Sequence, residues 1–472
     1  MNSQGKRCLE ENDFETEGDE DIRVASKKTR SSEHHCNTYL ETVDKRKLDF
    51  DFEKICSVTL SNINVYCCLV CGKYLQGRGN NSAAFLHSVN DNHHVFINFD
   101  TLKVYILPDN YEAKNVQFLK SIKYAIRPTY NEQDIKSFPQ QCYDLNNRKY
   151  LNGFIGLNNI SNNDYANVVI QLLGHVPPIR DYFLLKGLER NPESQLIRRL
   201  SIIVRKMWSP KLFKPHISPH ELLQYISLVS KQKFSTKESK DPRNFILWLL
   251  TELLSSSNDT EVKKLLAKQF QGKVETIDTK VRSINDSEGK TIKFVKEEQS
   301  SISRVVKFWY LSLDLPPSPL FKDGRDVNNL PQVKLEKLLE KFNNVQESHL
   351  SNSVRKYKIL KLPPYLMLHI NRFEANLELK IKNRNQTVVE LPQIMELNGA
   401  KYKLISNVVH EAAKVDNNND NIEVDDKSEW KIQLNDARSN QWFEIKNIDV
   451  KPKEEEFLFL SESYLQIWEK IH

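Results

Sequence analysis

Residues 156–172 read Gly156-Leu157-Asn158-Asn159-Ile160-Ser161-Asn162-Asn163-Asp164-Tyr165-Ala166-Asn167-Val168-Val169-Ile170-Gln171-Leu172. Asparagine crowds the first half, whereas the second half places apolar side chains at helical spacing. The stretch therefore predicts a loop that runs into a helix at 165–174. Asn163 and Asp164 stand at the junction, and the side chain of either residue could cap the helix by accepting a backbone N–H bond.

The chain beyond this stretch changes character about halfway along. Apolar residues recur at helical spacing in 194–207, 219–229 and 243–254. Runs typical of strands follow at 305–313, 365–370, 387–391, 402–409, 430–434, 442–445 and 457–460. Helices followed by strands predict an α+β domain over 141–472. A polar, acidic stretch at about 412–428 predicts a long loop within that domain.

The chain before residue 141 divides into a polar tail and a small module. Residues 1–45 carry too little apolar surface to offset the entropy of ordering, so we expect a disordered tail. Within it, residues 27–30 (Lys-Lys-Thr-Arg) fit a nuclear-import patch and equally a solvated basic turn. Residues 46–140 predict a compact α/β module, with short strands at 57–60, 65–69, 95–99 and 102–106 and a helix at 83–89.

The module contains a cluster of residues that bind metals. Cys68 and Cys71 form a Cys-x-x-Cys pair, and His87 and His93 follow downstream. Two thiolates and two imidazoles at such spacing suit tetrahedral zinc, and four protein ligands leave no open position for a catalytic water. The spacing therefore predicts one structural zinc ion.

Bulk composition narrows the class of protein without naming it. The 472 residues carry 68 basic and 62 acidic side chains, and this slight surplus creates no long-range field that would itself indicate nucleic-acid binding. The stretch 56–100 has few Lys and Arg residues for phosphate contacts, so we expect no direct sequence-specific nucleic-acid binding. We find no apolar run long enough to span a bilayer and expect no membrane association. A cysteine cluster that reads as metal binding fits a reducing, nuclear or cytosolic compartment.

Residues 156–172 resemble the active-site box of the ubiquitin-specific proteases, Gly-Leu-x-Asn-Leu-Gly-Asn-Thr-Cys-Tyr-x-Asn-x-x-x-Gln. In that resemblance the nucleophilic cysteine of the family falls on Asp164, and no cysteine follows Cys142 that could replace it. Further strings resemble the family over most of 141–472, among them 270–272, 311–316, 362–373 and 460–465. The resemblance implies a papain-like protease fold.

The same resemblance places the other catalytic positions. Asn159 matches the oxyanion donor of the family, the histidine base matches Glu429, and the residue that orients this base matches Lys446. Cysteine-protease chemistry needs a nucleophile, a base and an orienting group that act together. We therefore expect no catalytic residues and no protease activity. An enzyme that uses Ser161 or Asp164 as an unconventional nucleophile is the competing hypothesis.

The module at 46–140 resembles the zinc finger found in ubiquitin-specific proteases. That resemblance implies Cys68, Cys71, His87 and His93 as the ligands and His94 as a neighbour. Members with more than one zinc place further Cys and His ligands at positions that hold Cys56, Thr59, Gln76 and Ala83 here. We therefore expect a single zinc ion, with Cys56 and Cys67 as buried core thiols.

Both domains in this order resemble the catalytically inactive members of the family that act in pre-mRNA splicing, in the U4/U6.U5 tri-snRNP. The resemblance covers roughly 38–472. It implies a nuclear, non-catalytic scaffold that assembles or stabilises this particle through contacts with tri-snRNP and spliceosome proteins. A ubiquitin-binding adaptor without protease activity is the alternative, although the finger's pocket-forming sequence for ubiquitin is not obviously kept.

Overall fold

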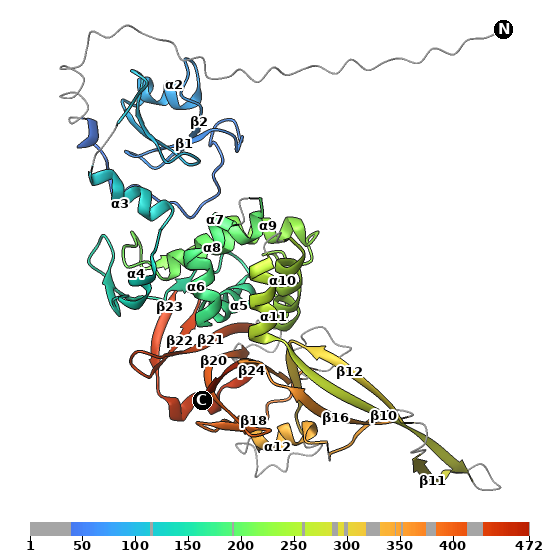
Figure 1. The fold of residues 1–472 in the computed structure, drawn as a ribbon. Coiled ribbons are helices and arrows are strands. Elements are labelled where there is room, and N and C mark those ends of the chain that lie inside the picture. Colours follow the sequence, from blue (N-terminus) through green and yellow to red (C-terminus); the bar gives the residue numbers. More distant parts are fainter. Residues whose placement is uncertain are drawn as a thin grey trace, which may run out of the picture.

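The computed structural model describes most of the chain beyond residue 38. The described ranges are 39–113, 117–190, 193–256, 260–285, 291–296, 301–317, 331–344, 346–350, 353–373, 384–412 and 428–471. The basic patch at 27–30 and nearly all of the polar loop predicted at about 412–428 lie outside these residues. Figure 1 shows a small domain at one end, helices in the middle, and strands beyond them.

The small domain is built on a five-stranded antiparallel sheet in the order β2-β1-β3-β4-β5. Its strands are β1 (Val65–Cys68), β2 (Tyr74–Gln76), β3 (Val95–Asn98), β4 (Val104–Ile106) and β5 (Tyr111–Glu112), and its helical elements are η1 (Lys45–Lys47), α2 (Ala83–Asn90), α3 (Gln117–Ile126) and α4 (Glu132–Lys136). Leu40 lies buried in the core of this domain beside Leu48 and Leu69. The sequence predicts that residues 39–45 belong to a disordered tail, whereas in the structure they pack on the small domain, which is called the finger domain below.

A group of helices follows the small domain. It comprises α5 (Asp164–Gly174), α6 (Pro177–Leu185), α7 (Gly187–Arg190), α8 (Gln195–Met207), α9 (His220–Val229), α10 (Pro242–Ser256) and α11 (Thr260–Phe270), with the short strands β6 (Gln141–Tyr143), β7 (Lys149–Leu151), β8 (Gly156–Leu157) and β9 (His216–Ile217). Every residue of α5 is buried. Because α5 contacts both α10 and the strand β21 (Ser428–Asp436), it joins the helices to the sheet of the domain.

The main sheet has eight strands, in the order β13-β17-β24-β20-β21-β22-β23, with β19 paired to β20. The strands are β13 (Tyr310–Asp314), β17 (Tyr365–Asn371), β19 (Met395–Leu397), β20 (Ala400–Ala412), β21 (Ser428–Asp436), β22 (Gln441–Lys446), β23 (Asp449–Lys453) and β24 (Glu462–Ile471). Only β13 and β17 pair in parallel within this sheet. Two hydrophobic cores lie on either side of the sheet. Trp430 is buried in one of them and Trp468 in the other.

A second sheet forms an arm that projects away from the body (Figure 1). It consists of β10 (Gly272–Asn285), β11 (Thr291–Lys296), β12 (Ile302–Phe308), β15 (Ser348–Leu350) and β16 (Ser353–Lys361), and β10 pairs with β11, β12 and β16. Smaller elements complete the domain: β14 (Gln332–Lys334), α12 (Leu335–Leu339), η3 (Glu340–Phe342), β18 (Val388–Glu390) and η5 (Glu455–Leu460).

The α+β class is confirmed, and the four predicted helices of the large domain agree with the structure to within two residues at each end. Two predicted strands are wrong. Residues 57–60 form a turn, because the backbone amides of Val58 and Thr59 donate hydrogen bonds to the Cys56 sulfur. Residues 457–460 belong to the helical turn η5, where only Leu458 is buried.

The predicted strand at 305–313 is in fact two strands that belong to different sheets. β12 lies in the arm and β13 lies in the main sheet, with a break at Trp309. None of the helices in the described part of the chain is both long and apolar enough to cross a membrane.

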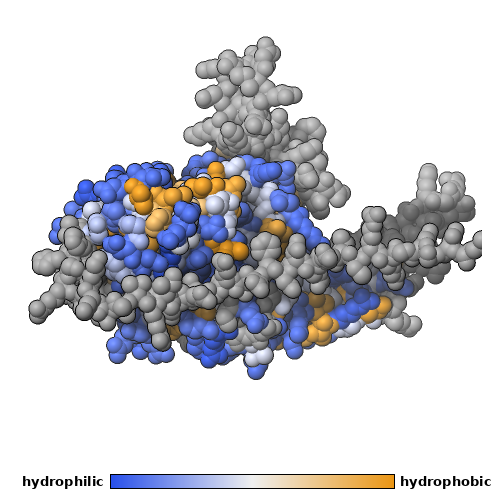
Figure 2. Space-filling model, turned by 90° about the horizontal axis from the view of Figure 1, so that it is seen from above, coloured by the Kyte–Doolittle hydropathy of each residue, from blue (hydrophilic) through white to orange (hydrophobic). Residues whose placement is uncertain are grey.

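Figure 2 views the molecule from above, from the side of the small domain, and shows an apolar patch on the surface. The finger domain exposes several large apolar side chains, namely Val58, Leu60, Ile63, Leu86 and Val89.

Candidate functional site

The four predicted metal ligands converge in the small domain. Cys68 ends β1, Cys71 lies in the following turn, His87 lies on α2, and His93 precedes β3. Their ligand atoms all lie within 4.8 Å of one another. The Nε2 atom of His87 lies 3.4 Å from the Cys71 sulfur and 3.0 Å from Nδ1 of His93. Ligand atoms of a tetrahedral zinc ion lie about 3.3–3.8 Å apart, so this donor set fits zinc.

The turn between the two cysteines is closed by the backbone. The amide of Gly72 donates to the carbonyl of Cys68 at 2.9 Å, and the amide of Cys68 donates to the carbonyl of Lys73 at 2.9 Å. Gly72 has φ +81°, and a Cβ atom there would lie 2.6 Å from the carbonyl oxygen of Lys47. Only glycine fits this position without movement of the backbone, and the turn then brings both sulfurs to the same point.

Asp91 supports the cluster and was missed from the sequence. Its carboxylate lies 2.7 Å from Nδ1 of His87, the ring nitrogen that faces away from the other ligands. A carboxylate on the outer nitrogen fixes the tautomer and orientation of a metal-binding histidine. The spacing of four residues between His87 and Asp91 at the end of a helix was the signal that could have revealed this pair.

The neighbouring residues agree with a single metal site. Both ring nitrogens of His94 are engaged, by the carbonyl of Leu107 and by the side chain of Asn92, each at 2.7 Å. Thr59 and Gln76 stand at two positions where members with more than one zinc have ligands. Here their side chains bind each other, because the Thr59 hydroxyl donates to the side-chain oxygen of Gln76 at 2.7 Å.

Cys56 and Cys67 are both buried as predicted, but their surroundings differ. The sulfur of Cys56 accepts backbone N–H bonds from Val58, Thr59 and Gln76. Burial opposes ionisation of Cys56, but a hydrogen bond from the Thr59 side chain together with these backbone bonds outweighs it and lowers the pKa of the thiol. Burial raises the pKa of the Cys67 thiol far above its usual range. Cys67 is therefore a core thiol, whereas Cys56 organises the turn at 57–60.

Asp164 lies at the start of α5, against the main sheet. The side chain is 4% exposed. One carboxylate oxygen accepts the backbone N–H of Tyr165 at 2.9 Å, and the other accepts the backbone N–H of Trp430 at 2.8 Å. Burial raises the pKa of Asp164, and the two amide bonds oppose this rise. The carboxylate thus joins α5 to β21 instead of facing solvent.

The side chains of Asn163 and Asn159, near Asp164, also make hydrogen bonds within the loop before α5. Asn163 stands at the N-cap of α5, but its side-chain oxygen accepts the N–H of Ile160 at 2.7 Å and makes no cap bond to the helix. The side-chain oxygen of Asn159 accepts the N–H of Asn163 at 3.0 Å. Neither side chain therefore caps α5, and the interaction at the junction is made by Asp164 with Tyr165 and Trp430.

Glu429 and Lys446 form an ion pair next to this point. Lys446 also lies 3.0 Å from Glu411, and Glu411 lies 2.7 Å from Lys431. The hydrogen bond that Lys446 donates to Glu429 raises the pKa of Lys446, which remains a cation. Glu429 is thus a carboxylate paired with an ammonium, at the position where the family resemblance places a histidine base. The structure thus brings the three sequence-predicted positions together, because Trp430 joins Asp164 to the strand that carries Glu429.

The cavity beside Asp164 is much smaller than the depression around Glu429 and Lys446. The cavity beside Asp164 measures about 10 Å³ and is lined by residues that include Asn167, Gln171 and Trp430. This is no more than the room of a single water molecule. The depression that contains Glu429 and Lys446 measures about 570 Å³ and is open and charged. A polypeptide segment can lie over Glu429 and Lys446, but it has no space beside Asp164.

His410 lies on β20 within the aromatic neighbourhood of Trp430, with 5.0 Å between the ring centroids. Its Nδ1 atom lies 3.4 Å from the carboxylate of Glu462, which also pairs with Arg384 at 2.7 Å. Burial opposes ionisation of Glu462, but the hydrogen bonds from His410 and Arg384 outweigh it and lower its pKa to about 2. His410 therefore belongs to a hydrogen-bonded cluster with Glu462 and Arg384 in the sheet.

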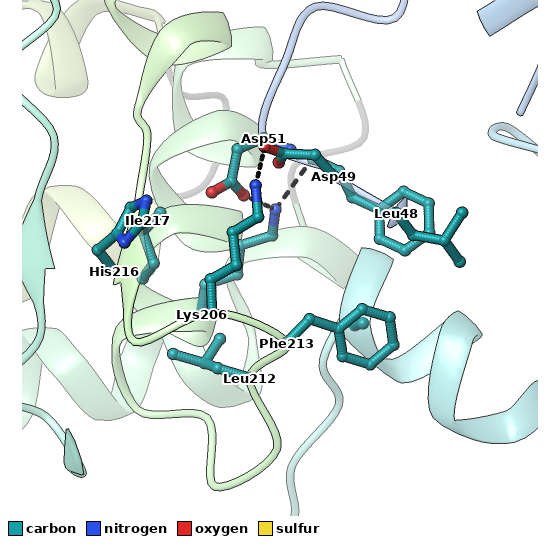
Figure 3. Close-up of a pocket in the computed structure, with 11 residues that line it drawn as sticks. Leu48, Asp49, Asp51, Lys206, Leu212, Phe213, His216 and Ile217 are labelled. Atoms are coloured by element: carbon teal, nitrogen blue, oxygen red, sulfur yellow. Dashed lines mark hydrogen bonds and ion pairs between the residues drawn. The ribbon is translucent and has the colours of Figure 1, made fainter. Parts of the chain in front are cut away.

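The two domains are joined by a seam of opposite charges (Figure 3). Asp51 lies 2.6 Å from the ammonium of Lys206 and accepts the backbone N–H of Ser218 at 2.9 Å. Lys206 also donates to the carbonyl of Phe50 at 3.2 Å, and Asp49 pairs with Lys214. Asp51 and Lys206 are separated by 155 residues, so no local pattern in the sequence could have revealed this pair.

The seam is tightly closed. The cavity shown in Figure 3 measures about 40 Å³ and is lined by residues of both domains, including Leu48, Leu212 and Ile217. Burial opposes ionisation of Asp51, but the charge and hydrogen bond of Lys206 outweigh it and lower the pKa of this carboxyl. A largely buried ion pair between Asp51 and Lys206 therefore lies at the junction of the two domains.

Comparison with known proteins identifies both domains. Residues 155–468 match the family described as ubiquitin carboxyl-terminal hydrolase, and residues 56–118 match the zinc finger found in ubiquitin hydrolases and other proteins. The Cys and His cluster described above lies within the second match, and its donor set is that of one structural zinc ion.

Relatives match over nearly the whole chain. The chain is 44% identical to the pre-mRNA-splicing factor SAD1 of Saccharomyces cerevisiae, over 96% of this chain and 97% of that protein. It is 39% identical to the probable mRNA-splicing protein ubp10 of Schizosaccharomyces pombe, over 92% and 88%. It is 36% identical to human ubiquitin carboxyl-terminal hydrolase 39, over 97% and 84%.

A solved structure supports the same assignment. The crystal structure of an essential yeast splicing factor matches with a TM-score of 0.77 at 43% identity, and the match covers 92% of this chain and all of that one. The family resemblance predicted from residues 156–172 and from the metal cluster is thereby confirmed. The chain therefore belongs to the ubiquitin carboxyl-terminal hydrolase family, in its branch of pre-mRNA-splicing factors.

Proposed function

We propose that this protein acts in pre-mRNA splicing as a non-catalytic nuclear scaffold, which assembles or stabilises the U4/U6.U5 tri-snRNP through contacts with its proteins. The splicing role rests on relatives that match almost the entire chain, two of which are named as splicing proteins. The observation that carries the non-catalytic part is the position of Asp164. Its carboxylate stands where the family has its thiol, and it is buried and bonded to Trp430.

The absence of catalysis follows from three positions taken together. Asp164 is a poor nucleophile towards an amide, Glu429 is no substitute for a histidine base, and Lys446 is a cation where the family has an orienting carboxylate or amide. A nucleophile, base and orienting group act as a unit, so one restored member does not restore the rate. The small cavity beside Asp164, about 10 Å³, supports the proposal.

For the finger, we propose that Cys68, Cys71, His87 and His93 bind one structural zinc ion. The hydrogen bond from the Cys68 thiol lowers the pKa of Cys71, which favours the thiolate form that binds zinc. The zinc ion, once bound, joins β1 and α2 of a domain whose core is small. It supplies stability and no chemistry.

Affinity purification of the tagged protein from nuclear extract at moderate salt, followed by mass spectrometry, tests the scaffold proposal. We expect recovery of tri-snRNP proteins in similar amounts with wild type and Asp164→Ala protein that is still folded. Recovery of ubiquitin conjugates without splicing proteins would support the ubiquitin-binding adaptor and overturn the scaffold. A pull-down on immobilised ubiquitin gives the complementary result, because a scaffold without ubiquitin affinity shows no binding in the micromolar range.

A further inference from the structure

The projecting arm carries a concentration of positive charge that the composition of the whole chain conceals. Among the strand residues of the arm whose side chains are described, nine are basic and two are acidic, a surplus of seven. The basic residues are Lys273, Lys280, Lys296, Arg304, Lys307, Arg355, Lys356, Lys358 and Lys361. The entire chain has a surplus of only six positive charges. The described strand residues of the arm therefore carry a strong local surplus of positive charge.

Three of these lysines form a row across three neighbouring strands. Lys273 of β10 lies opposite Lys307 of β12 on one side and opposite Lys361 of β16 on the other. Directly opposed residues of antiparallel strands project from the same face of a sheet. The β10–β16 register shifts directly after Lys273, but neighbouring strands lie about 4.8 Å apart, so the three lysines extend from backbone positions that are close together. All three residues are exposed.

Glu275 lies two residues along β10 from Lys273, but it accepts a hydrogen bond from Ser303 at 2.6 Å and pairs with no lysine of the row. Arg355 pairs with Asp278, and Lys296 and Lys356 pair with Glu347, whereas no ion pair involves Lys273, Lys307 or Lys361 within the described residues. Like charges directly opposite each other destabilise a sheet.

Lysine on an edge strand guards a sheet against unwanted pairing. That role can account for Lys307 on β12. It cannot account for Lys273, which lies on the central strand β10 between two partners. An unbalanced row of this kind is explained by an anionic partner.

We propose that the row formed by Lys273, Lys307 and Lys361 binds the phosphate backbone of RNA without reading its sequence. Lysine is depleted in protein–protein interfaces, whereas protein–nucleic acid interfaces are strongly positive. The row consists of lysines alone and has no aromatic side chain on which a base could stack. Contact with phosphate is therefore the interaction that the row offers. The relatives of this chain are splicing factors, and splicing factors work on RNA.

The test is fluorescence anisotropy with the full-length, zinc-loaded protein and a fluorescein-labelled 20-nucleotide oligouridine, at 50–200 mM KCl. We expect a Kd of about 10⁻⁴–10⁻⁶ M for wild type, as is usual for binding to phosphates alone. The triple variant Lys273→Glu, Lys307→Glu, Lys361→Glu is expected to bind at least ~10-fold more weakly. Its plot of log K against log salt should be shallower by about 2, since each phosphate contributes about 0.7 for a single strand.

A matched control changes the same net charge elsewhere. Lys264, Lys401 and Lys451 are exposed and lie outside the arm, and their replacement by Glu should alter the affinity by less than ~2-fold, because screening limits the reach of charge at these salt concentrations. Thermal melts monitored by circular dichroism verify the fold of both triple variants. If the Glu triple of the arm fails to fold, Lys273→Gln, Lys307→Gln, Lys361→Gln takes its place, with an expected loss of at least ~3-fold.

Three results would overturn the proposal. The first is the absence of binding by wild type at 50 mM KCl. The second is an equal loss in the arm triple and the control triple. The third is equal or tighter binding of a labelled 20-residue polyglutamate at the same salt, which would assign the row to an acidic protein segment instead of RNA.

Discussion

A carboxylate oxygen of Asp164 accepts the backbone N–H of Trp430 at 2.8 Å, across a sequence separation of 266 residues. This bond fixes the start of helix α5 to strand β21 of the main sheet. In the family resemblance the same position holds the catalytic thiol. The side chain that replaces it has thus become a structural connection between the helical and the sheet halves of the domain.

Loss of this connection should lower stability. We expect Asp164→Asn to reduce the free energy of unfolding by about 1–3 kcal/mol, because an amide cannot accept at both of its ends and leaves one buried N–H of Tyr165 or Trp430 without a partner. Urea denaturation followed by tryptophan fluorescence measures the change. Asp109→Asn at an exposed position is the matched control and should change the value by less than about 0.5 kcal/mol.

The metal site can be tested by zinc content. Elemental analysis of the purified chain should give one zinc ion per molecule, and Cys71→Ser should remove it. Asp91→Asn should retain the metal but weaken its binding by about 10–100-fold in a chelator competition, because the outer nitrogen of His87 loses its carboxylate. Cys56→Ser is the control and should keep one zinc. Loss of zinc in Cys56→Ser, or a count of two in wild type, would contradict the assignment.

The seam between the domains predicts a coupling that hydrogen exchange can measure. Replacement of Asp51 by Asn leaves Lys206 buried without a counter-charge, an effect that costs about 3–5 kcal/mol in buried ion pairs. The backbone N–H of Ser218, which donates to Asp51, should then exchange at least ~10-fold faster. Unchanged protection at Ser218 would show that the two domains are held together by other contacts.

The pH dependence of this seam follows from the pKa of Asp51. The folded state lowers this pKa below its usual value near 3.8. A depressed carboxyl pKa stabilises the fold at any pH above the unfolded value, and the stabilisation is lost as the pH falls through the folded value. The protection of Ser218 should therefore be constant from neutral pH down to about 5 and should decline only below about 4.

Glu462 allows a sharper test in the acid range. Its pKa is lowered to about 2, from an ordinary value of 4.5, a difference that corresponds to about 3 kcal/mol of stability at neutral pH. This contribution is lost as the pH falls from about 5 through 2, and roughly half of it should be gone by pH 3. Glu462→Gln removes the carboxylate, so the difference in unfolding free energy between wild type and variant should shrink over this range. A difference that does not depend on pH would exclude the ion-pair account.

The sequence revealed those parts of the molecule that depend on short-range patterns. The helix after Asp164 and the cluster of Cys68, Cys71, His87 and His93 could be predicted because helical spacing and ligand spacing are local. The predicted boundary between the domains near residue 140 stays a prediction. The separation of helices and strands was sufficient for the α+β class, which the structure confirms.

Other parts could not be predicted, for identifiable physical reasons. The arm strands β10 and β16 were missed because they mix charged and apolar residues without the regular alternation of a half-buried strand. The bond between Asp164 and Trp430 and the pair between Asp51 and Lys206 join residues more than 150 positions apart. Only the folded chain reveals such contacts.

The most direct test of the central claim is hydrolysis of a fluorogenic ubiquitin amide by the zinc-loaded chain. We expect wild type, Asp164→Ala and Asp164→Cys all to give the rate of buffer alone, because a restored thiol still lacks a base at Glu429 and an orienting group at Lys446. Activity in wild type that disappears in Asp164→Ala would contradict the account, since it would show that Asp164 is a nucleophile. Cleavage by Asp164→Cys alone would equally contradict it, since it would show that the rest of the catalytic machinery is intact.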